Sequence, residues 1–242
     1  PFCDRKYNID IERSPFKPSN FKAYRSLKKI LCQNRYNIIH AHTPMGGALA
    51  RLAARDVRKK GAKVLYTVHG FHFCKGSPLL NWLVYYPLER WLARHTDCLI
   101  TINFEDYNLA TGHKFKAGSI EHVHGVGVDT ERFHPVSHEE RNRLRLKHGY
   151  RKEDFLIYYV AELNKNKNQG LLIKALARTK DKVPGIRLLL VGDGGMEESY
   201  KALTKKLGVD DLVDFLGFRT DVDETAKMCD VAVASSLREG LP

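Results

Sequence analysis

Short apolar runs alternate with helically spaced apolar residues along all 242 residues of the chain. The short runs are bounded by turn-forming residues, which is typical of buried strands, whereas apolar residues that recur every three or four positions indicate amphipathic helices. A regular alternation of strands and helices is typical of a parallel sheet covered by helices on both faces. The pattern therefore predicts an α/β protein.

The first half of this pattern holds four predicted strands, at 38–42, 64–68, 98–102 and 120–124. An amphipathic helix is predicted before them, over 20–36. Thr43 is a suitable N-cap and Pro44 suits the first helical position, so a second helix is predicted from there to about Lys60. These elements make up one α/β half.

The second half repeats the alternation after a linker of mixed polarity over 129–154. Its predicted strands span 155–160, 187–191, 214–216 and 231–234, and its predicted helices span 168–178, 196–207 and about 221–228. Two α/β halves joined by a linker leave a cleft between them, and ligands of such folds bind at the carboxyl ends of the strands. We expect helices on both faces of each sheet.

Polar residues and glycines follow six of the predicted strands at those carboxyl ends. They are His42, His69, His124, Asn164, Gly192 and Ser235. Six such positions in two consecutive α/β halves predict a functional site.

Composition bounds what the chain can be. A hydrophobic content of 43% and a charged content of 28% are ordinary for a globular protein, and no apolar run is long enough to predict a membrane-spanning helix. The five cysteines form no C-x-x-C pair, which argues against a disulfide framework or a structural zinc site and favours a reducing cytoplasm. The chain starts with proline and stops just after a predicted strand, so we expect residues to be missing at both ends.

The formal net charge of +12 is unevenly distributed along the chain. Residues 1–135 carry an excess of ten cations, and residues 136–242 an excess of two. Composition alone favours a solvated surface with a high isoelectric point. If the basic half has a partner, that partner is acidic, such as anionic lipid headgroups, a diphosphate-bearing acceptor or nucleic acid. No aromatic–basic nucleic-acid motif is visible, so we do not expect nucleic acid as a partner.

The segment AELNKNKNQG (161–170) follows a predicted strand and leads into a helix. Free N–H groups and the dipole at the start of a helix favour anions. Lys165 and Lys167 add point charges suited to phosphate. We interpret this loop as an anion site, with a solvated lysine-rich loop as the alternative.

A glycine-rich turn, LLLVGDGG (188–195), resembles a dinucleotide-binding fingerprint but lacks its third spaced glycine. Glu197 and Glu198 at the start of the next helix would repel a pyrophosphate. We therefore expect a tight strand-to-helix turn and no nicotinamide cofactor.

His69 and Glu239 are the candidate side chains for contacts with a sugar. His69 ends a predicted strand before Gly70, and its imidazole can donate to a hydroxyl or to a developing charge near neutral pH. Glu239 follows the last predicted strand, where a carboxylate can accept hydrogen bonds from vicinal hydroxyls. The structural alternatives are a histidine satisfied by backbone groups and a surface acid.

Together these segments resemble the family 4 glycosyltransferases, and more narrowly the bacterial enzymes of capsule, exopolysaccharide and lipid-linked oligosaccharide assembly. The segments that carry the resemblance occur in the family's order and cover almost the whole chain. They are IIHAHTPMGGALARLAAR (38–55), YTVHGFHF (66–73), HTDCLITINFEDYNLA (95–110), HGVGVDTERF (124–133), AELNKNKNQGLLIKAL (161–176), LLLVGDGG (188–195), VDFLGFRTDV (213–222) and CDVAVASSLREGLP (229–242).

The resemblance implies two Rossmann-like domains of the GT-B architecture, both truncated in this chain. Residues 1–130 would form the acceptor-binding domain, without its first strand and glycine-rich loop. Residues 131–242 would form the nucleotide-sugar-binding domain, without its C-terminal part. The implied activity is that of a retaining hexosyltransferase, with a UDP-linked sugar as donor and a lipid-linked or polysaccharide hydroxyl as acceptor. No metal and no further cofactor is implied.

The resemblance also implies roles for single residues. His69 and Glu239 are the expected catalytic pair. The other expected contacts are the donor diphosphate at Lys165 and Lys167, the nucleotide base at Phe218 and Arg219, and the donor sugar at Glu239 and Gly240.

The implied reaction is a same-face substitution, in which a leaving phosphate oxygen takes the acceptor proton while the protein orients both substrates. The second glutamate of the family's paired motif would lie beyond residue 242. We therefore expect the chain alone to be inactive.

One position departs from the family. Members often carry an arginine and a lysine around the diphosphate; Lys167 matches the lysine, but Glu162 stands at the arginine position. A carboxylate cannot hold a diphosphate unaided. The charge must therefore come from Lys165, Lys167 and the helix end, or the donor binds differently.

Three other functions stay open on the sequence alone. His40 and His42 lie on one face of a predicted strand and could begin the metal site of a hydrolase. Histidines that could join them are His69, His72, His122 and His124. The basic half could instead belong to a non-catalytic nucleotide-binding or nucleic-acid-binding module. A sugar-nucleotide epimerase would share the architecture.

A membrane-facing surface is predicted in the first half. Arg51, Arg55 and Lys59 recur every four residues and would form one stripe on their helix. Apolar and interfacial aromatic residues with further cations lie downstream, namely Leu79, Leu80, Trp82, Leu83, Tyr85, Tyr86 and Trp91 beside Lys75, Arg90 and Arg94. We expect peripheral attachment to the inner face of the cell membrane, where a lipid-linked acceptor would be met. The alternative is that the aromatic residues are core and that the basic stripe is merely solvated.

Overall fold

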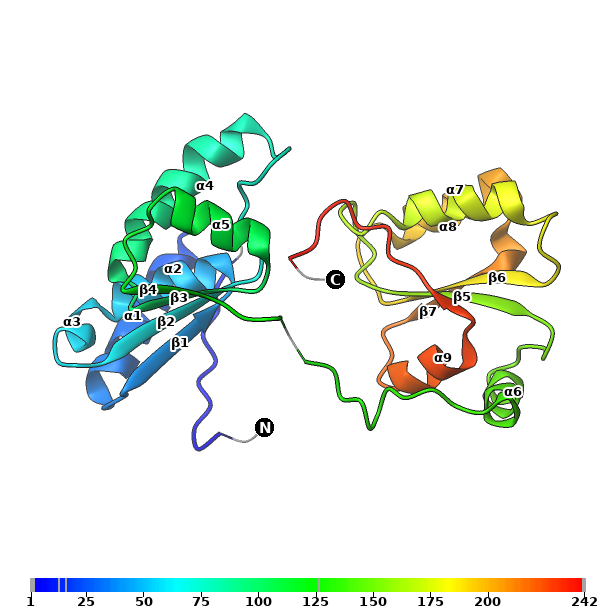
Figure 1. The fold of residues 1–242 in the computed structure, drawn as a ribbon, viewed down its shortest axis with the longest axis horizontal. Coiled ribbons are helices and arrows are strands. Elements are labelled where there is room, and N and C mark those ends of the chain that lie inside the picture. Colours follow the sequence, from blue (N-terminus) through cyan, green and yellow to red (C-terminus); the bar gives the residue numbers. More distant parts are fainter. Residues whose placement is uncertain (1–2, 13, 16, 126, 241–242) are drawn as a thin grey trace. The chain divides into compact units, whose positions relative to one another are not determined.

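The structure is a computed structural model that describes residues 3–12, 14–15, 17–125 and 127–240. The described chain divides into two compact units, the first ending at residue 125 and the second beginning at Gly127. Each unit is built on a four-stranded parallel sheet, as the alternation of strands and helices predicted (Figure 1).

The sheet of the first unit has the strand order β1-β2-β3-β4, and all neighbouring strands are parallel. The strands are β1 (Ile38–His42), β2 (Lys63–Val68), β3 (Cys98–Thr101) and β4 (Ser119–His122). Their bounds differ from the predicted ones by at most two residues, because short apolar runs between turn residues mark buried strands well.

The helices of the first unit alternate with these strands along the chain. They are α1 (Ser19–Gln33), α2 (Pro44–Ala53), α3 (Arg55–Arg58), α4 (Leu79–Leu92) and α5 (Phe104–Gly112), with a 3-10 turn at Ala93–His95. The single helix predicted from Thr43 to Lys60 is wrong in one respect, since it is interrupted at Ala54. None of the described helices has the length and apolar run that crossing a bilayer would require.

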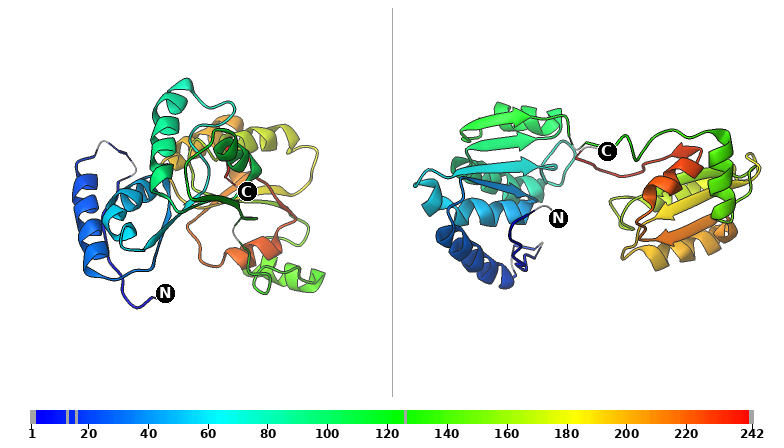
Figure 2. Two further views of the ribbon diagram at one scale, coloured as in Figure 1. Left: turned by 60° about the vertical axis from the view of Figure 1, so that its left-hand side comes forward. Right: turned by 90° about the horizontal axis from the view of Figure 1, so that it is seen from below.

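Only one face of the first sheet carries a hydrophobic core. Ile39, Val64 and Leu99 point into a cluster to which α1, α2, α4 and α5 contribute side chains. On the other face, Ile38 and His40 are exposed. The right-hand view of Figure 2 shows these strands from the open side. The expectation of helices on both faces is therefore wrong for the described part of this unit.

The sheet of the second unit has the strand order β7-β6-β5-β8, again parallel throughout. Its strands are β5 (Phe155–Val160), β6 (Ile186–Val191), β7 (Val213–Gly217) and β8 (Val231–Ala232). Helices α7 (Gln169–Thr179) and α8 (Glu197–Leu207) cover one face, and α6 (His138–Lys147) and α9 (Val222–Met228) cover the other (Figure 1). A 3-10 turn spans Asp210–Leu212. Here the expectation of helices on both faces is confirmed.

Helix α6 lies inside the segment that the sequence predicted to be a linker. Ser137 caps it by accepting a hydrogen bond from the backbone N–H of Glu140. Arg145 is 4% exposed and donates to the Met228 carbonyl and to Asp230, at 2.9 and 2.7 Å. A helix this rich in charge has little hydrophobic periodicity, so the sequence pattern missed it.

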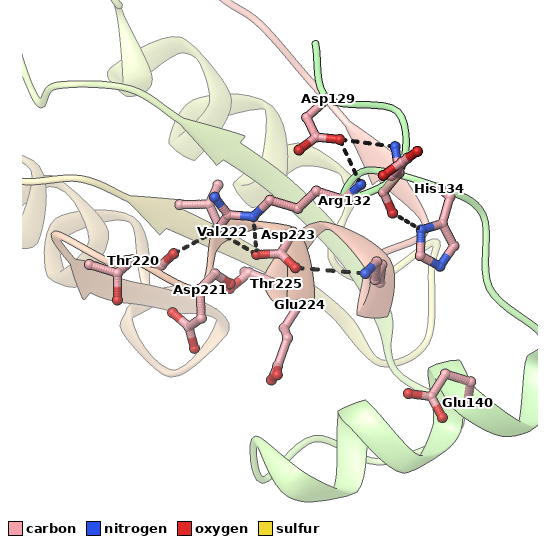
Figure 3. Close-up of polar contacts among 12 residues, drawn as sticks. Asp129, Arg132, His134, Glu140, Thr220, Asp221, Val222, Asp223, Glu224 and Thr225 are labelled. Carbon is pink, nitrogen blue, oxygen red and sulfur yellow. Dashed lines mark hydrogen bonds and ion pairs between the residues drawn. The ribbon is translucent and has the colours of Figure 1, made fainter. Parts of the chain in front are cut away.

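The segment that precedes α6 is fastened to α9 by ionic contacts (Figure 3). The Arg132 guanidinium donates to Asp223 at 2.9 and 2.7 Å and to the Thr220 carbonyl at 2.8 Å. Asp129 accepts from the backbone N–H of Arg132. The hydrogen bond from Arg132 is the main reason why the pKa of Asp223 is lowered. These contacts make residues 129–135 part of the second unit rather than a free linker.

Candidate active site

Two loops of the second unit are joined side by side at the carboxyl ends of β5 and β8. The Asn166 side chain donates to the Arg238 carbonyl at 2.9 Å, and the backbone N–H of Leu237 donates to the Asn166 carbonyl at 2.8 Å. The Ser235 hydroxyl donates to the carbonyls of Lys167 and Asn168. Because β5 and β8 are neighbours, segments about 70 residues apart in sequence form one polar surface.

Lys167 and Glu239 meet in this surface. Lys167 Nζ lies 2.5 Å from Glu239 Oε1, and each side chain is about one quarter exposed. Burial raises the pKa of the Glu239 carboxyl, but hydrogen bonds from Lys167 and Ser236 outweigh it, and the net pKa is lowered. The site therefore presents the Lys167 amino group beside a carboxylate whose ionised form is favoured.

The start of α7 lies directly after Lys167. Asn168 has a left-handed backbone with φ of 54°, and no side chain caps the helix there. The Asn164 side chain accepts from the backbone N–H of Lys167 at 2.9 Å, which fixes the loop before the helix. A helix start beside a lysine is a favourable place for an anion. Lys165 and Glu162 are exposed in the same loop.

The glycine-rich turn after β6 packs closely against the backbone of this loop. Gly192 has φ of 128°, and a Cβ there would lie 2.3 Å from the Ala161 carbonyl oxygen. A Cβ on Gly194 would lie 2.5 Å from the Leu163 carbonyl oxygen. The glycines thus allow two backbones to touch, which agrees with a tight turn.

Phe218 and Arg219 follow β7, the edge strand of the same sheet. The Phe218 ring is 77% exposed, so it is available to stack on a planar ligand. The Arg219 guanidinium forms a close ion pair with Asp221. Of the two residues, only Phe218 offers a surface without first breaking an ion pair.

Several histidine side chains lie near the carboxyl ends of the strands in the first unit. His42 Nδ1 and His69 Nε2 are 3.0 Å apart, at the ends of β1 and β2. His40 Nε2 lies 2.8 Å from Thr67 Oγ1, and its pKa is lowered by burial and by the neighbouring His42. In the pair of His42 and His69, one ring must donate and the other accept. His42 therefore orients His69; the sequence analysis had placed the two histidines together only as part of a possible metal site.

Comparison with known proteins identifies this combination of units. Residues 7–125 match a family described as glycosyl transferase 4-like domain, and residues 140–242 match glycosyl transferases group 1. The chain belongs to this glycosyltransferase family. This confirms the resemblance seen in the sequence.

Curated relatives are longer than this glycosyltransferase chain. It is 56% identical over 241 residues to a protein named as the glycosyltransferase EpsD of Bacillus subtilis (strain 168). It is 30% identical over 226 residues to an Escherichia coli protein named UDP-Gal:alpha-D-GlcNAc-diphosphoundecaprenol alpha-1,3-galactosyltransferase. These alignments cover 100% and 92% of the chain, which spans 63% and 58% of the two relatives.

Solved structures share the fold. A crystal structure of Anabaena Alr3699/HepE in complex with UDP and glucose matches with a TM-score of 0.70 and 22% identity, over 93% of this chain and 59% of the other. The lipopolysaccharide glycosyltransferase WaaG matches with a TM-score of 0.64 and 16% identity, over 94% and 74% of the two chains. The fold is therefore the predicted one, with two Rossmann-like units of the GT-B type.

Of the histidines on which the metal-hydrolase alternative relied, His40 is hydrogen-bonded to Thr67, and His42 and His69 are hydrogen-bonded to each other. In the described part of the chain, one group has the spacing of a metal site, namely His148, Asp221 and Glu224. Both acids of that group are already paired, Asp221 with Arg219 and Glu224 with Lys147. The family assignment favours transfer chemistry over metal-dependent hydrolysis.

The predicted basic stripe of the glycosyltransferase is wrong for Arg51. Arg51 is 1% exposed, and its guanidinium forms two hydrogen bonds with Glu89 on α4. It also lies over the Tyr66 ring, 4.0 Å from the centroid. Arg55 and Lys59 are exposed. A spacing of four residues places side chains on one face of a helix but does not say whether that face is outside.

The predicted site residues are thus found in two places. Lys165, Lys167, Phe218, Arg219, Glu239 and Gly240 belong to the second unit, and His69 belongs to the first. Val126, Leu241 and Pro242, which form part of the family segments, lie outside the described residues. Asn166 was missed as a residue that joins the two loops, and Ser235 was singled out only because it follows a strand. The one signal in the sequence is that both loops follow predicted strands. The sequence does not tell that these two strands are neighbours in the sheet.

Proposed function

We propose that this glycosyltransferase moves a sugar from a UDP-linked donor to a hydroxyl of a lipid-linked or saccharide acceptor, with retention of anomeric configuration. The observation that carries the proposal is the contact of Lys167 with Glu239 beside the uncapped start of α7. Support comes from the UDP and glucose bound in the HepE structure. The name of the Escherichia coli relative, which includes UDP-Gal and a diphosphoundecaprenol acceptor, points the same way.

The donor diphosphate is proposed to bind Lys167 and the N–H groups at the start of α7, with Lys165 at its edge. A diphosphate competes with Glu239 for the Lys167 ammonium, and this frees the carboxylate to accept hydrogen bonds from sugar hydroxyls. Gly240 would lie beside the sugar. The uracil would stack on Phe218 and pair with groups near Arg219. His69, whose ring is hydrogen-bonded to His42, would donate to a sugar hydroxyl.

The proposed chemistry needs no enzymic nucleophile. The bond between the anomeric carbon and the phosphate oxygen breaks, and the acceptor oxygen bonds to the same carbon on the same face. The acceptor proton goes to the leaving phosphate oxygen, and UDP departs. The charges of Lys167 and the helix start stabilise the negative charge that develops on the phosphate. No metal and no cofactor is required.

The test uses a longer protein that contains this chain and has the length of its curated relatives. It is incubated with nucleotide-diphosphate sugars and a diphospholipid-linked saccharide, and the product is examined by NMR. An α-linked product from an α-linked donor is expected, with a rate that EDTA leaves unchanged. An inverted anomeric carbon or a loss of activity on chelation would overturn the retaining, metal-free reaction. Absence of transfer from every such donor would overturn the function itself.

Single substitutions connect this reaction to the site. Ala at Lys167, His69 or Glu239 is expected to lower transfer by roughly a hundredfold or more, in the range seen when a charge-stabilising group is removed. Lys174→Ala changes an exposed lysine on α7 and serves as the control. The 242-residue chain by itself is proposed to be inactive; measurable transfer by it would contradict that statement.

A further inference from the structure

Helix α4 carries an apolar surface on the outside of the first unit. Six large apolar side chains along its outer face are exposed by 38–81%, which is unusual for a helix whose inner face is already packed. They are Leu79, Leu80, Leu83, Val84, Leu88 and Trp91. At helical spacing these positions form one continuous arc of the helix. We call them the outer face of α4.

The inner side of α4 is firmly attached to the unit. Trp82 and Tyr86 contact the buried Phe73 ring, with centroids 5.6 and 5.5 Å away. Glu89 is held by Arg51 in the buried ion pair. The outer face is therefore not a loose segment that could turn inward. A fixed helix with apolar residues on all sides needs a partner on its exposed side.

The charges around the outer face are cationic. Lys75, Arg90 and Arg94 are exposed next to it, and between residues 75 and 95 the sole acid of the sequence is the buried Glu89. A second copy of the chain would bring like charges together at this surface. An anionic lipid surface offers both the apolar interior and the negative headgroups that match this arrangement.

A basic pocket adjoins the last turn of α4. It has a volume of about 360 Å³ and is lined by Arg55, Arg58, Lys59, Lys63, His95 and Asp97, among others. Trp91 on the outer face contacts His95, with ring centroids 5.3 Å apart. Burial lowers the pKa of His95 most, and the guanidinium groups of Arg55 and Arg58 lower it further. The cationic surroundings outweigh the one carboxylate, Asp97, which Arg58 already engages at 2.9 Å.

We infer that the first unit docks on an anionic lipid bilayer, with the outer face of α4 in the interface and the adjoining basic pocket around a lipid phosphate. Trp91 lies where the outer face of α4 meets the basic pocket. In the docked state this position corresponds to the headgroup level of the bilayer, where tryptophan is favoured. Arg51 does not touch lipid and instead holds α4 in place. The inference goes beyond sugar transfer, since docking is measured without donor or acceptor.

Vesicle flotation of the whole chain tests the docking. Binding is expected to vesicles of phosphatidylcholine mixed with phosphatidylglycerol, and to fall at least tenfold with phosphatidylcholine alone or in high salt. The paired change of Leu79→Ser and Leu83→Ser should abolish it, while Leu146→Ser, at an exposed leucine of α6, should not. Arg55→Glu with Lys59→Glu should weaken binding, while Lys205→Glu with Lys206→Glu on α8 should not.

Tryptophan fluorescence locates the contact. The chain has two tryptophans, so a blue shift on adding anionic vesicles that disappears in Trp91→Phe places the outer face of α4 in the lipid. Circular dichroism of each variant confirms that it is folded. Equal binding to neutral and anionic vesicles, or full binding by the Leu79 and Leu83 variant, overturns the inference. So does vesicle-free dimerisation that this variant abolishes, because the surface would then bind a second copy.

Discussion

Arg51 and Glu89 form a bidentate ion pair inside the first unit, with N–O distances of 2.8 and 3.1 Å. The pair joins α2 to α4, and its Arg51 guanidinium lies over the ring of Tyr66 on β2. It connects the core of the unit to the helix that we infer to meet the membrane.

Arg51→Met is expected to destabilise the chain by about 3–5 kcal/mol, because it leaves the Glu89 carboxylate buried without a partner. Arg51→Met combined with Glu89→Leu should cost less than the single change, since no charge is then buried. Urea unfolding monitored by circular dichroism measures both. A double variant less stable than the single one would show that the pair does more than neutralise charge.

Gly192→Ala is expected to lower the free energy of unfolding by about 1–3 kcal/mol, because the new methyl group would press on the Ala161 carbonyl. The shift of that carbonyl should also weaken UDP binding through the loop that carries Lys167. Gly195→Ala is the matched control, since no atom lies within 4 Å of its added Cβ. Equal unfolding midpoints for the two variants would refute the close approach.

Cys229 is expected to resist alkylation in the folded chain. Burial raises its pKa to about 12, so at a pH near the ordinary thiol value of about 8.5 almost none of it is thiolate. Cys32 is exposed and should react under the same conditions. Mass spectrometry after timed iodoacetamide treatment compares the two sites, and equal labelling rates would contradict the burial of Cys229.

The ion pair of Lys167 and Glu239 should make stability depend on pH. The folded pKa of Glu239 is lowered from 4.5, so its stabilisation is present above that pH and is lost as the pH falls through the folded value. Denaturant unfolding of wild type and Glu239→Gln at several pH values isolates this contribution. The difference between them should shrink on acidification; a difference that grows would mean that Glu239 is not paired.

The positions of the strands could be predicted from the sequence. The presence of helix α6 and the burial of Arg51 on α2 could not. Apolar runs such as 155–160 have a strong signal, and the structure has β5 with the same bounds. Helix α6 has almost no such signal in the sequence. It is held in place by a few specific contacts, such as the ion pair of Arg145 with Asp230, rather than by an apolar stripe. Arg51 shows the same limit, since its burial depends on Glu89, 38 residues away.

Candidate site residues could be found from the sequence because they follow strands, but their pairing could not. Nothing in the sequence says that β8 lies beside β5, and this neighbourhood brings Glu239 to Lys167. The contact of His42 with His69 likewise depends on the register of β1 with β2. Sheet order, which is set by long-range packing, therefore decides which side chains can act together.

Calorimetric titration of the chain with UDP and UDP-sugars tests the central claim most directly, because donor binding requires the site around Lys167. We expect binding by wild type and by Lys174→Ala. Lys167→Ala should bind about tenfold to a hundredfold more weakly, as the loss of a charge-assisted hydrogen bond of about 1.5–3 kcal/mol implies. Equal affinities for wild type and Lys167→Ala, or no binding of any nucleotide-diphosphate sugar, would contradict the account.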